Sequence, residues 1–354
     1  EYDLTDALTV SAGVRRQEDS GRSRRLYSNY YGDQSVWGSG YSTTGRLLDA
    51  SYYTEDWDTG ADFNDEGHTD YRLALDYALN DDINVYGSFS TGYIAPTISV
   101  SQVLDPNELD AYEVGMKSYL ADGTVRLNVA LYHNEYTGLS YTVYEAQGDT
   151  ILSRSETGGG LTSMGAEFEL LWLPTDALTI NAGFVWDDTE MDEYALTESR
   201  FFEGPFNQEG GYYPVRVGNS WFADGDESRP VATPTYILDG EDASFSPEFI
   251  VNLDVAYRFE LGSLGALTPG LTFYYQDDFK TMNEPYTFAQ QDGYETIDLR
   301  LIWETPIENL SVNAYVMNAT DEEYKVSQNV FSNGRIMADY GRQRHWGVRM
   351  GYNF

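Results

Sequence analysis

Few side chains of this sequence are placed to carry out chemistry, and none forms a known catalytic pattern. The three histidines, His68, His133 and His345, lie far apart and lack the spacing of metal ligands. A buried or interfacial position is the simpler interpretation of each. No Gly-x-Ser-x-Gly elbow, phosphate-binding loop or dinucleotide fingerprint occurs. We therefore expect no catalytic residues, no metal site and no cofactor, and a protein that is not an enzyme.

Three short segments carry residue types that can hold ions. ADGDES at 223–228 has oxygen ligands in an order similar to calcium loops, but the rest of such a loop is missing. DDTEMDE at 187–193 is similar, and a solvated acidic loop is the interpretation that we favour for both. TGGGL at 157–161 lacks the lysine and the following helix of a phosphate site, so it predicts a turn.

The long segment 188–246 is the best candidate for ligand binding. Its part 201–222, FFEGPFNQEGGYYPVRVGNSWF, is dense in aromatic residues, Gly and Asn. Long connections in compact proteins are usually functional or disordered. The side chains that could stack on or grip a ligand are Phe201, Phe206, Tyr212, Tyr213, Arg216 and Trp221. Packing of this loop against its neighbours explains the same residues equally well.

A basic segment, RRQEDSGRSRR at 15–25, stands out in a very acidic chain. The formal net charge is -37, from 58 acidic and 21 basic residues. Nucleic-acid binding needs many Lys and Arg residues, so we expect no nucleic-acid partner. The basic segment could instead meet lipopolysaccharide phosphates or an anionic ligand, or it could be a solvated loop.

The elements that must position these segments are strands. Apolar side chains alternate with polar ones along most of the chain, as in Trp346, Val348, Met350, Tyr352 and Phe354 at its end. A period of two is typical of strands with one apolar face, and no helical period is sustained. We predict twelve strands, near 7–17, 68–79, 82–93, 109–120, 123–145, 150–172, 177–190, 244–260, 266–280, 291–304, 309–318 and 343–354.

The connections between these strands favour a membrane barrel over a soluble sandwich. Short connections near 80–82, 121–123, 174–177, 262–265 and 306–309 alternate with long ones near 18–67, 94–109, 188–246, 281–291 and 319–342, once 146–150 is counted as a hairpin turn. An up-and-down barrel has short periplasmic turns and long extracellular loops. The alternation therefore predicts an all-β, antiparallel up-and-down transmembrane β-barrel.

The two faces of each strand should then meet different surroundings. Apolar side chains such as Phe168 and Leu253 should face lipid, and charged ones such as Glu167 and Asp254 should face the lumen. Trp172 and Trp303 lie beside short turns, whereas Trp186 and Trp346 lie toward long loops, as expected of aromatic residues at both membrane interfaces. The chain has no cysteine and no long apolar run for a transmembrane helix.

Several motifs together resemble the barrel of TonB-dependent outer-membrane receptors. VYGSFSTGYIAPTISV at 85–100 precedes PNELDAYEVGMKS at 106–118, which resembles the Pro-Glu and Tyr-Glu-x-Gly-x-Lys element of that family with Asn107 inserted. GGGLTSMGAEFELLWLPTDALTINAGF at 158–184 looks like its next strand pair. NAYVMNATDEEY at 313–324 resembles the Asn-Leu-Thr-Asp-x-x-Tyr element before its last loop, and GVRMGYNF resembles its closing strand.

The resemblance implies an active transporter of the bacterial outer membrane. It would bind a scarce large solute, such as a ferric siderophore, haem, a corrinoid or an oligosaccharide, and import it with energy from the TonB complex. Phe354 and Tyr352 would belong to the signal that the barrel-assembly machinery reads. A passive porin formed by this chain alone is the alternative.

The family barrel has 22 strands and a plugged lumen, whereas the sequence predicts twelve strands. We therefore expect residues 1–354 to form the C-terminal part of a barrel, with the plug domain and the first strands outside this chain. A self-sufficient smaller barrel is the alternative. If the first is right, the strand at 7–17 should not pair with the strand at 343–354.

Overall fold

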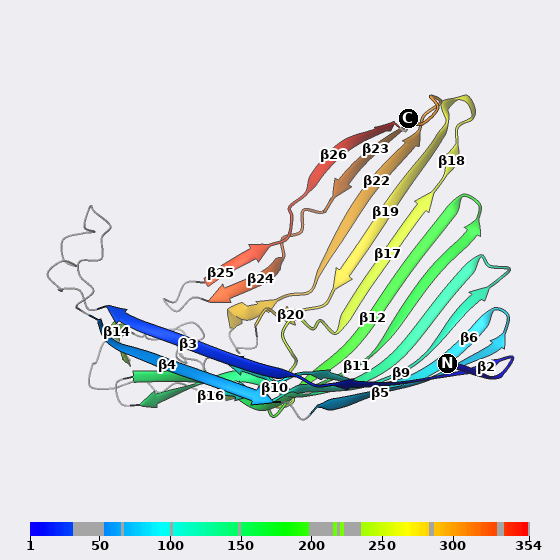
Figure 1. The fold of residues 1–354 in the computed structure, drawn as a ribbon. Coiled ribbons are helices and arrows are strands. Elements are labelled where there is room, and N and C mark those ends of the chain that lie inside the picture. The colour runs from blue at the N-terminus through cyan, green and yellow to red at the C-terminus, as the bar shows by residue number, and fades with distance from the viewer. Residues whose placement is uncertain are drawn as a thin grey trace.

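The protein is almost entirely strand, as its computed structural model shows (Figure 1). The structure describes residues 1–30, 53–64, 67–99, 102–147, 150–197, 215–217, 220–222, 235–282, 287–330 and 336–352. Two short 3-10 helices, η3 (Gly262–Leu264) and η4 (Thr287–Ala289), are the helical elements of these residues. None of the described helices is long and apolar enough to cross a membrane.

One large antiparallel sheet of 14 strands organises the chain. Neighbours in sequence are neighbours in the sheet, apart from the strands that lie within long connections, so the sheet is an up-and-down meander (Figure 1). Its strands in order are β1 (Tyr2–Thr5), β2 (Leu8–Gln17), β5 (His68–Asn80), β6 (Ile83–Ile94), β9 (Asn107–Leu120), β10 (Val125–Gln147), β11 (Thr150–Thr175), β12 (Leu178–Asp192), β17 (Phe249–Tyr257), β19 (Ala266–Gln276), β22 (Tyr294–Glu304), β23 (Leu310–Met317) and β26 (His345–Tyr352), with β18 (Phe259–Glu260) paired to β19.

All twelve predicted strands are present, with differences at their ends. The strand predicted from residue 244 begins only at Phe249, because Phe245 has a φ of 60° and residues before β17 form turns. The strand predicted to reach residue 280 ends at Gln276. A further short strand, β1, precedes the first predicted one and pairs with β2 across the turn at Asp6 and Ala7.

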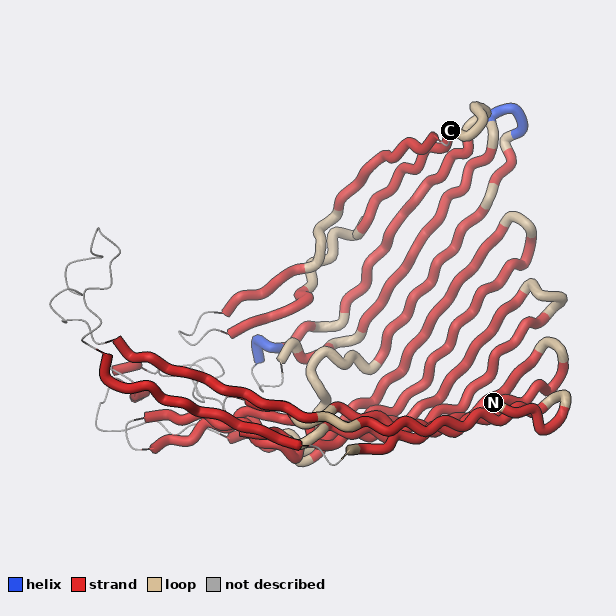
Figure 2. The backbone as a smooth tube through the Cα atoms, viewed as in Figure 1, coloured by secondary structure: helices blue, strands red, loops and turns tan. Residues whose placement is uncertain are grey.

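The two ends of the sheet carry connections of different length, as the sequence predicted. Short turns join strands along one end, and the long connections leave from the other (Figure 2). The long connections contain two-stranded sheets of their own. These are β3 (Ser20–Tyr30) with β4 (Tyr53–Asn64), β7 (Thr97–Ser99) with β8 (Gln102–Leu104), β13 (Ala195–Thr197) with β16 (Thr235–Ile237), β14 (Val215–Val217) with β15 (Ser220–Phe222), β20 (Phe279–Lys280) with β21 (Gln290–Gln291), and β24 (Lys325–Val330) with β25 (Ile336–Tyr340).

The edges of the sheet are β1 and β26, and these strands do not pair with each other within the described chain. Among the described strands β26 pairs with β23 alone, and Tyr352 lies opposite Leu310 beside the short turn at 306–309. β2 pairs with β1 and β5. The expectation that the strand at 7–17 does not pair with the strand at 343–354 is therefore confirmed.

One face of the sheet is apolar and exposed. Large apolar side chains such as Leu75 (46% exposed), Leu131 (51%) and Val348 (61%) stand on it without cover. In register they lie beside one another, for example Phe168 opposite Phe184 and Leu299 opposite Leu271. Buried apolar side chains are few in the described residues, because a single sheet has no second layer to pack against. Such a surface is typical of a barrel wall in lipid.

Tryptophans mark both borders of this apolar face. Trp172 and Trp303 lie near the short turns, and the indole N–H of Trp303 donates to the carbonyl oxygen of Leu264 (2.9 Å). Trp186 lies toward the loop end and donates to Glu248 (3.3 Å), and Trp346 lies at the loop end of β26. This placement agrees with two aromatic girdles at the interfaces of a bilayer.

The opposite face carries hydrogen-bonded polar side chains. Arg300 and Asp254 form a two-point ion pair (2.5 and 2.8 Å), and Thr272 donates to the same carboxylate (2.7 Å). Several large side chains on this face lie over a glycine directly opposite on the next strand. These pairs are Tyr86 over Gly115, Tyr132 over Gly165, Arg300 over Gly270 and Tyr315 over Gly347.

The segment after β23 forms a tight turn built on Asn318. This residue is buried and has a φ of 48°, a conformation that Asn tolerates better than most side chains. Its amide donates to the carbonyl oxygens of Glu322 (2.8 Å) and Arg342 (3.1 Å) and accepts from the Glu322 N–H (2.8 Å). It thereby ties the end of β23 to both sides of the last long connection.

Replacing Asn318 by Ala is expected to lower the free energy of unfolding by about 1–2 kcal/mol, because buried backbone groups lose their partners. Urea unfolding in lipid vesicles measures the loss. Glu323→Ala, at an exposed residue of the same turn region, is the control and should change stability by less than about 0.5 kcal/mol. Equal effects of the two substitutions would contradict this role of Asn318.

Candidate functional site

Two of the long connections at the loop end are tied to each other in their described parts. Lys325 donates its side-chain N–H to the carbonyl oxygens of Phe288 (3.1 Å) and Gln290 (2.6 Å), joining β24 to the connection before β22. Tyr324 stacks on Tyr294 with ring centroids 4.1 Å apart. Met191, Leu238 and Phe279 are buried at this end of the chain. The described parts of these connections are therefore packed.

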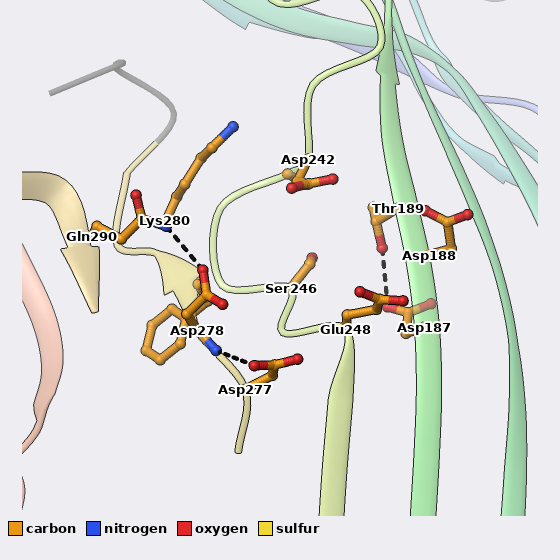
Figure 3. A pocket seen from close by; sticks show the side chains of 12 residues that line it. Asp187, Asp188, Thr189, Asp242, Ser246, Glu248, Asp277, Asp278, Lys280 and Gln290 are labelled. Atoms are coloured by element: carbon orange, nitrogen blue, oxygen red, sulfur yellow. Dashed lines mark hydrogen bonds between the residues drawn. The ribbon is translucent and has the colours of Figure 1, made fainter. Parts of the chain in front are cut away.

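A polar pocket of about 130 Å³ opens at this end between β12, the segment that precedes β17, and β20 (Figure 3). Carboxylates dominate its lining, and a single lysine is among them. The residues are Asp187, Asp188, Thr189, Asp242, Ala243, Ser246, Glu248, Asp277, Asp278, Phe279, Lys280 and Gln290.

Asp187 is the best-held carboxylate of the pocket. It lies on the polar face of β12, opposite Gly165 in the sheet register. Its oxygens accept hydrogen bonds from the hydroxyls of Tyr132 (2.8 Å), Ser163 (2.9 Å) and Thr189 (3.0 Å). Three neutral donors orient the carboxylate without cancelling its charge.

The opposite side of the pocket is formed after β19. Asp277 accepts from the N–H of Asp278 (3.0 Å), and Asp278 accepts from the amide of Gln290 (2.9 Å). Lys280 points away from these two carboxylates (Figure 3) and pairs with Glu241 at 2.8 Å. The pocket therefore keeps a strongly negative potential.

This arrangement suits cationic groups and hydrogen-bond donors on a ligand. Carboxylates and hydroxyls accept such donors strongly when water is partly excluded. Among the residues that the structure describes, no three His, Asp or Glu side chains converge closely enough to hold a metal ion. The pocket can orient a polar solute, and it offers no nucleophile paired with a base.

The aromatic ligand residues proposed from the sequence are not joined to this pocket by the structure. Phe201, Phe206, Tyr212 and Tyr213 lie outside the described residues, as does Phe354. Arg216 and Trp221 face each other as backbone partners in the hairpin β14–β15. The ligand-binding role proposed for the loop residues and the assembly role proposed for Phe354 stay predictions. Tyr352, the other residue of the proposed assembly signal, is the last residue of β26.

Two expectations about the sequence segments were wrong. Residues 187–192 belong to β12 rather than to a solvated loop, because Tyr132 and Ser163 on neighbouring strands hold Asp187. Residues 157–161 lie within β11 rather than in a turn, at a break in the β10–β11 register that Gly158 accommodates with a φ of 133°. The segment ADGDES lies outside the described residues.

Sequence reasoning missed the pocket residues Asp242, Glu248, Asp277 and Asp278. A signal existed, since acidic pairs lie near the loop-side ends of two predicted strands, at 187–188 and 277–278. A meander brings the ends of strands that are close in sequence to the same side of the sheet, and only β17 separates these two strands.

The histidines lie in three separate places. His68 stacks on Tyr93 at 4.1 Å and lies 3.5 Å from both Asp70 and Glu108. His133 contacts Glu135 at 2.9 Å, and His345 contacts the carbonyl oxygen of Gln343. Of the basic segment, Arg16 donates to Thr69 (3.0 Å) at the end of β2.

The sequence matches one protein-family model over residues 1–319, described as TonB dependent receptor-like, beta-barrel. No curated protein matches the sequence significantly.

Solved structures share the fold at low sequence identity. The ferric yersiniabactin uptake receptor FyuA from Yersinia pestis is 17% identical, with a TM-score of 0.65 over 99% of this chain and 44% of that chain. The ferric-catecholate import receptor Fiu from E. coli K12 is 15% identical, with a TM-score of 0.63 over 99% and 43%. The siderophore receptor PiuA from Acinetobacter baumannii is 14% identical, with a TM-score of 0.63 over 99% and 41%. This chain thus spans less than half the length of these receptors.

Proposed function

Because the chain belongs to the TonB-dependent receptor β-barrel family, we propose that it forms part of an active transporter in the bacterial outer membrane. The transporter binds a scarce large solute at its loop end and imports it with energy from the TonB complex. The coupling runs through a plug segment outside these residues. The chain is not an enzyme in this proposal.

The main observation in support of this proposal is the antiparallel sheet, which has two unpaired edges and one exposed apolar face. Unpaired strand edges in lipid cost several kcal/mol for each backbone group. β1 and β26 each have a single neighbour within the described chain, so further strands would be needed to complete a barrel wall. A large barrel agrees with this arrangement better than a small porin made of this chain alone.

We propose a ferric siderophore as the solute, ahead of haem, a corrinoid or an oligosaccharide. This proposal is supported by the structures that share the fold. FyuA, Fiu and PiuA are described as receptors for ferric yersiniabactin, ferric catecholates and a siderophore. The pocket around Asp187 and Asp277 would take hydrogen-bond donors or cationic groups of the solute. The loop residues Phe206, Tyr212, Tyr213, Arg216 and Trp221 are proposed to complete the binding surface.

The test of this function is uptake of labelled iron by cells with and without the gene. Iron-starved wild-type cells should accumulate iron from at least one ferric siderophore of a chemically varied panel. The deletion strain and cells treated with a protonophore should both lose this uptake. Diffusion of small solutes that continues with the protonophore, without siderophore uptake, would instead indicate a passive pore.

The proposed orientation makes a prediction for protease added to intact cells. The long connection 188–246 should be cut, because it faces the medium, and the turn at 174–177 should be spared, because it faces the periplasm. Mass spectrometry of the fragments locates the cuts. Cleavage at 174–177 in unbroken cells, with 188–246 intact, would reverse the topology.

A further inference from the structure

Two neighbouring short turns of the sheet carry large apolar side chains. The turn between β18 and β19 contains Leu264, the turn between β22 and β23 contains Ile307, and each of these residues is 60% exposed. The turns lie side by side because β19 pairs with β22 as far as Ala266 and Glu304, at the ends of the two strands (Figure 1). We refer to these two turns, residues 261–265 and 305–309, as the apolar turns.

The other turns at this end of the described sheet have charged tips. Each of the four has an exposed aspartate, and these are Asp6, Asp81, Asp122 and Asp176. Aspartate is a common turn residue that leaves its carboxylate in water. The turn at 261–265 has no charged residue, and Glu308 is the single charge of the turn at 305–309. The two kinds of turn therefore suit different surroundings.

The apolar face of the sheet continues into the apolar turns. Phe259 and Leu261 are both exposed and lie at alternate positions that lead into the first turn. Phe259 is in register with Leu267, and Leu267 is in register with Trp303. Leu261 thus lies about 7 Å beyond the row that contains Trp303, given two residues of strand. The Trp303 indole N–H, which donates to the carbonyl oxygen of Leu264, joins the aromatic girdle to the turn.

The charges of the same hairpin are held on the opposite, polar face. Arg258 forms a two-point ion pair with Glu304 and a second ion pair with Glu260 (2.8 Å). Glu260 and Glu304 both lie opposite Ala266 in the sheet register. The alternation of the strand therefore keeps the side of Phe259 and Leu261 free of charge up to the turn.

The backbone of the apolar turns is hydrogen-bonded within the protein. The N–H of Leu264 donates to the carbonyl oxygen of Leu261 (3.2 Å), and the N–H of Leu310 donates to that of Ile307 (3.1 Å). The N–H of Ile307 donates to the hydroxyl of Thr305 (3.2 Å). Backbone groups that enter a bilayer need such internal partners. Both turns meet this condition at the positions of their large apolar side chains.

We propose that the apolar turns form a membrane anchor, which inserts Leu261, Leu264 and Ile307 among the acyl chains of the periplasmic leaflet. The four aspartate turns stand in water instead. Lipid is the partner that the structure favours, because these turns continue the apolar face of the sheet. A protein docking site would be bounded by a polar rim. The inference rests on the proposed outer-membrane location and goes beyond it, because a short turn of a barrel is otherwise expected in the periplasm.

The anchor makes the apolar surface taller over β17–β23 than over β2–β12. A bilayer adapts to such a difference by local thickening, or the protein adapts by tilting. The receptor should therefore sit in the membrane with the apolar turns drawn toward the hydrocarbon and the aspartate turns held outside it.

Spin labels in the full-length receptor test the anchor. The described chain has no cysteine of its own, so a nitroxide can be attached at Leu264→Cys, with Asp122→Cys as the matched turn control and Leu131→Cys on the apolar face as the lipid reference. The receptor is placed in vesicles of phosphatidylethanolamine and phosphatidylglycerol. Collisions with oxygen, which concentrates in lipid, are compared with collisions with a water-soluble nickel chelate.

The label at 264 should collide more with oxygen than with nickel, as at 131, and the label at 122 should show the reverse. Ile307→Cys repeats the measurement on the neighbouring turn and should give the result of 264. A preference for nickel at both 264 and 307 would overturn the anchor. Protection from both reagents would show that protein covers the turns, and would overturn it as well.

The label at 131 separates failure of this inference from failure of the proposed function. Lipid contact at 131 with water contact at 264 refutes the anchor alone. Water contact at 131 would mean that the apolar face does not lie in a membrane, and the proposed outer-membrane transporter would fail with it.

Discussion

Replacing Phe168 by arginine should prevent most of the protein from assembling in the membrane. Phe168 lies near the centre of the membrane part of β11 and packs between Val129 and Phe184 on the apolar face. A lysine or arginine facing lipid at the bilayer midplane costs about 2–4 kcal/mol. That loss is a large fraction of the stability of most domains, about 5–15 kcal/mol.

The control changes the neighbouring residue to the same amino acid. Glu167 is exposed on the polar face and makes no hydrogen bond within the described residues, so Glu167→Arg should assemble normally. Heat-modifiable migration on gels reports the folded fraction of each variant, and urea unfolding in vesicles gives the free energy. If both variants assembled equally well, the faces assigned to lipid and lumen would be wrong.

A valine at Gly165 is expected to cost about 3 kcal/mol, the upper range for overpacking a filled site. An added Cβ would overlap the carbonyl oxygen of Trp186 and the hydroxyl of Tyr132. Displacing Tyr132 would also break its hydrogen bond to Asp187 and disturb the acidic pocket. The substitution should therefore lower both the urea midpoint of the barrel and the affinity for solute.

Gly183→Val provides the matched comparison on the adjacent strand and the same face. Space is open there, and valine favours strands over glycine. The barrel itself should keep its stability or gain up to about 1 kcal/mol. A large destabilisation at Gly183, measured by the same urea titration, would show that the space beside Gly183 is not open in the barrel wall.

The sequence allowed the wall of the barrel to be predicted but not the architecture of its loop end. Alternation such as Trp346, Val348 and Met350 locates strands because one face must be apolar throughout. The ends of strands were predicted less accurately than their positions. Phe245 fits the alternation of β17, yet its positive φ and its hydrogen bond to the Lys280 carbonyl oxygen take it out of the strand.

The pocket could not be derived in the same way, because its residues are far apart in sequence. Asp187, Asp242 and Asp278 come together only through the pairing of β12 with β17 and of β17 with β19. The hairpin β3–β4 was also missed, because it lies inside the long connection near 18–67. Local patterns do not report contacts between loops.

The glycines that lie under large side chains have a consequence for the evolution of this wall. Each glycine and the residue above it share one volume, so selection acts on the two positions together. In aligned homologues, a larger residue at position 165 should occur with a smaller one at 132, and the same exchange should link 115 with 86 and 347 with 315. Position 183 has no such counterpart within the described chain. The residue at 183 should therefore vary independently of its cross-strand neighbours, Glu169 and Asn252.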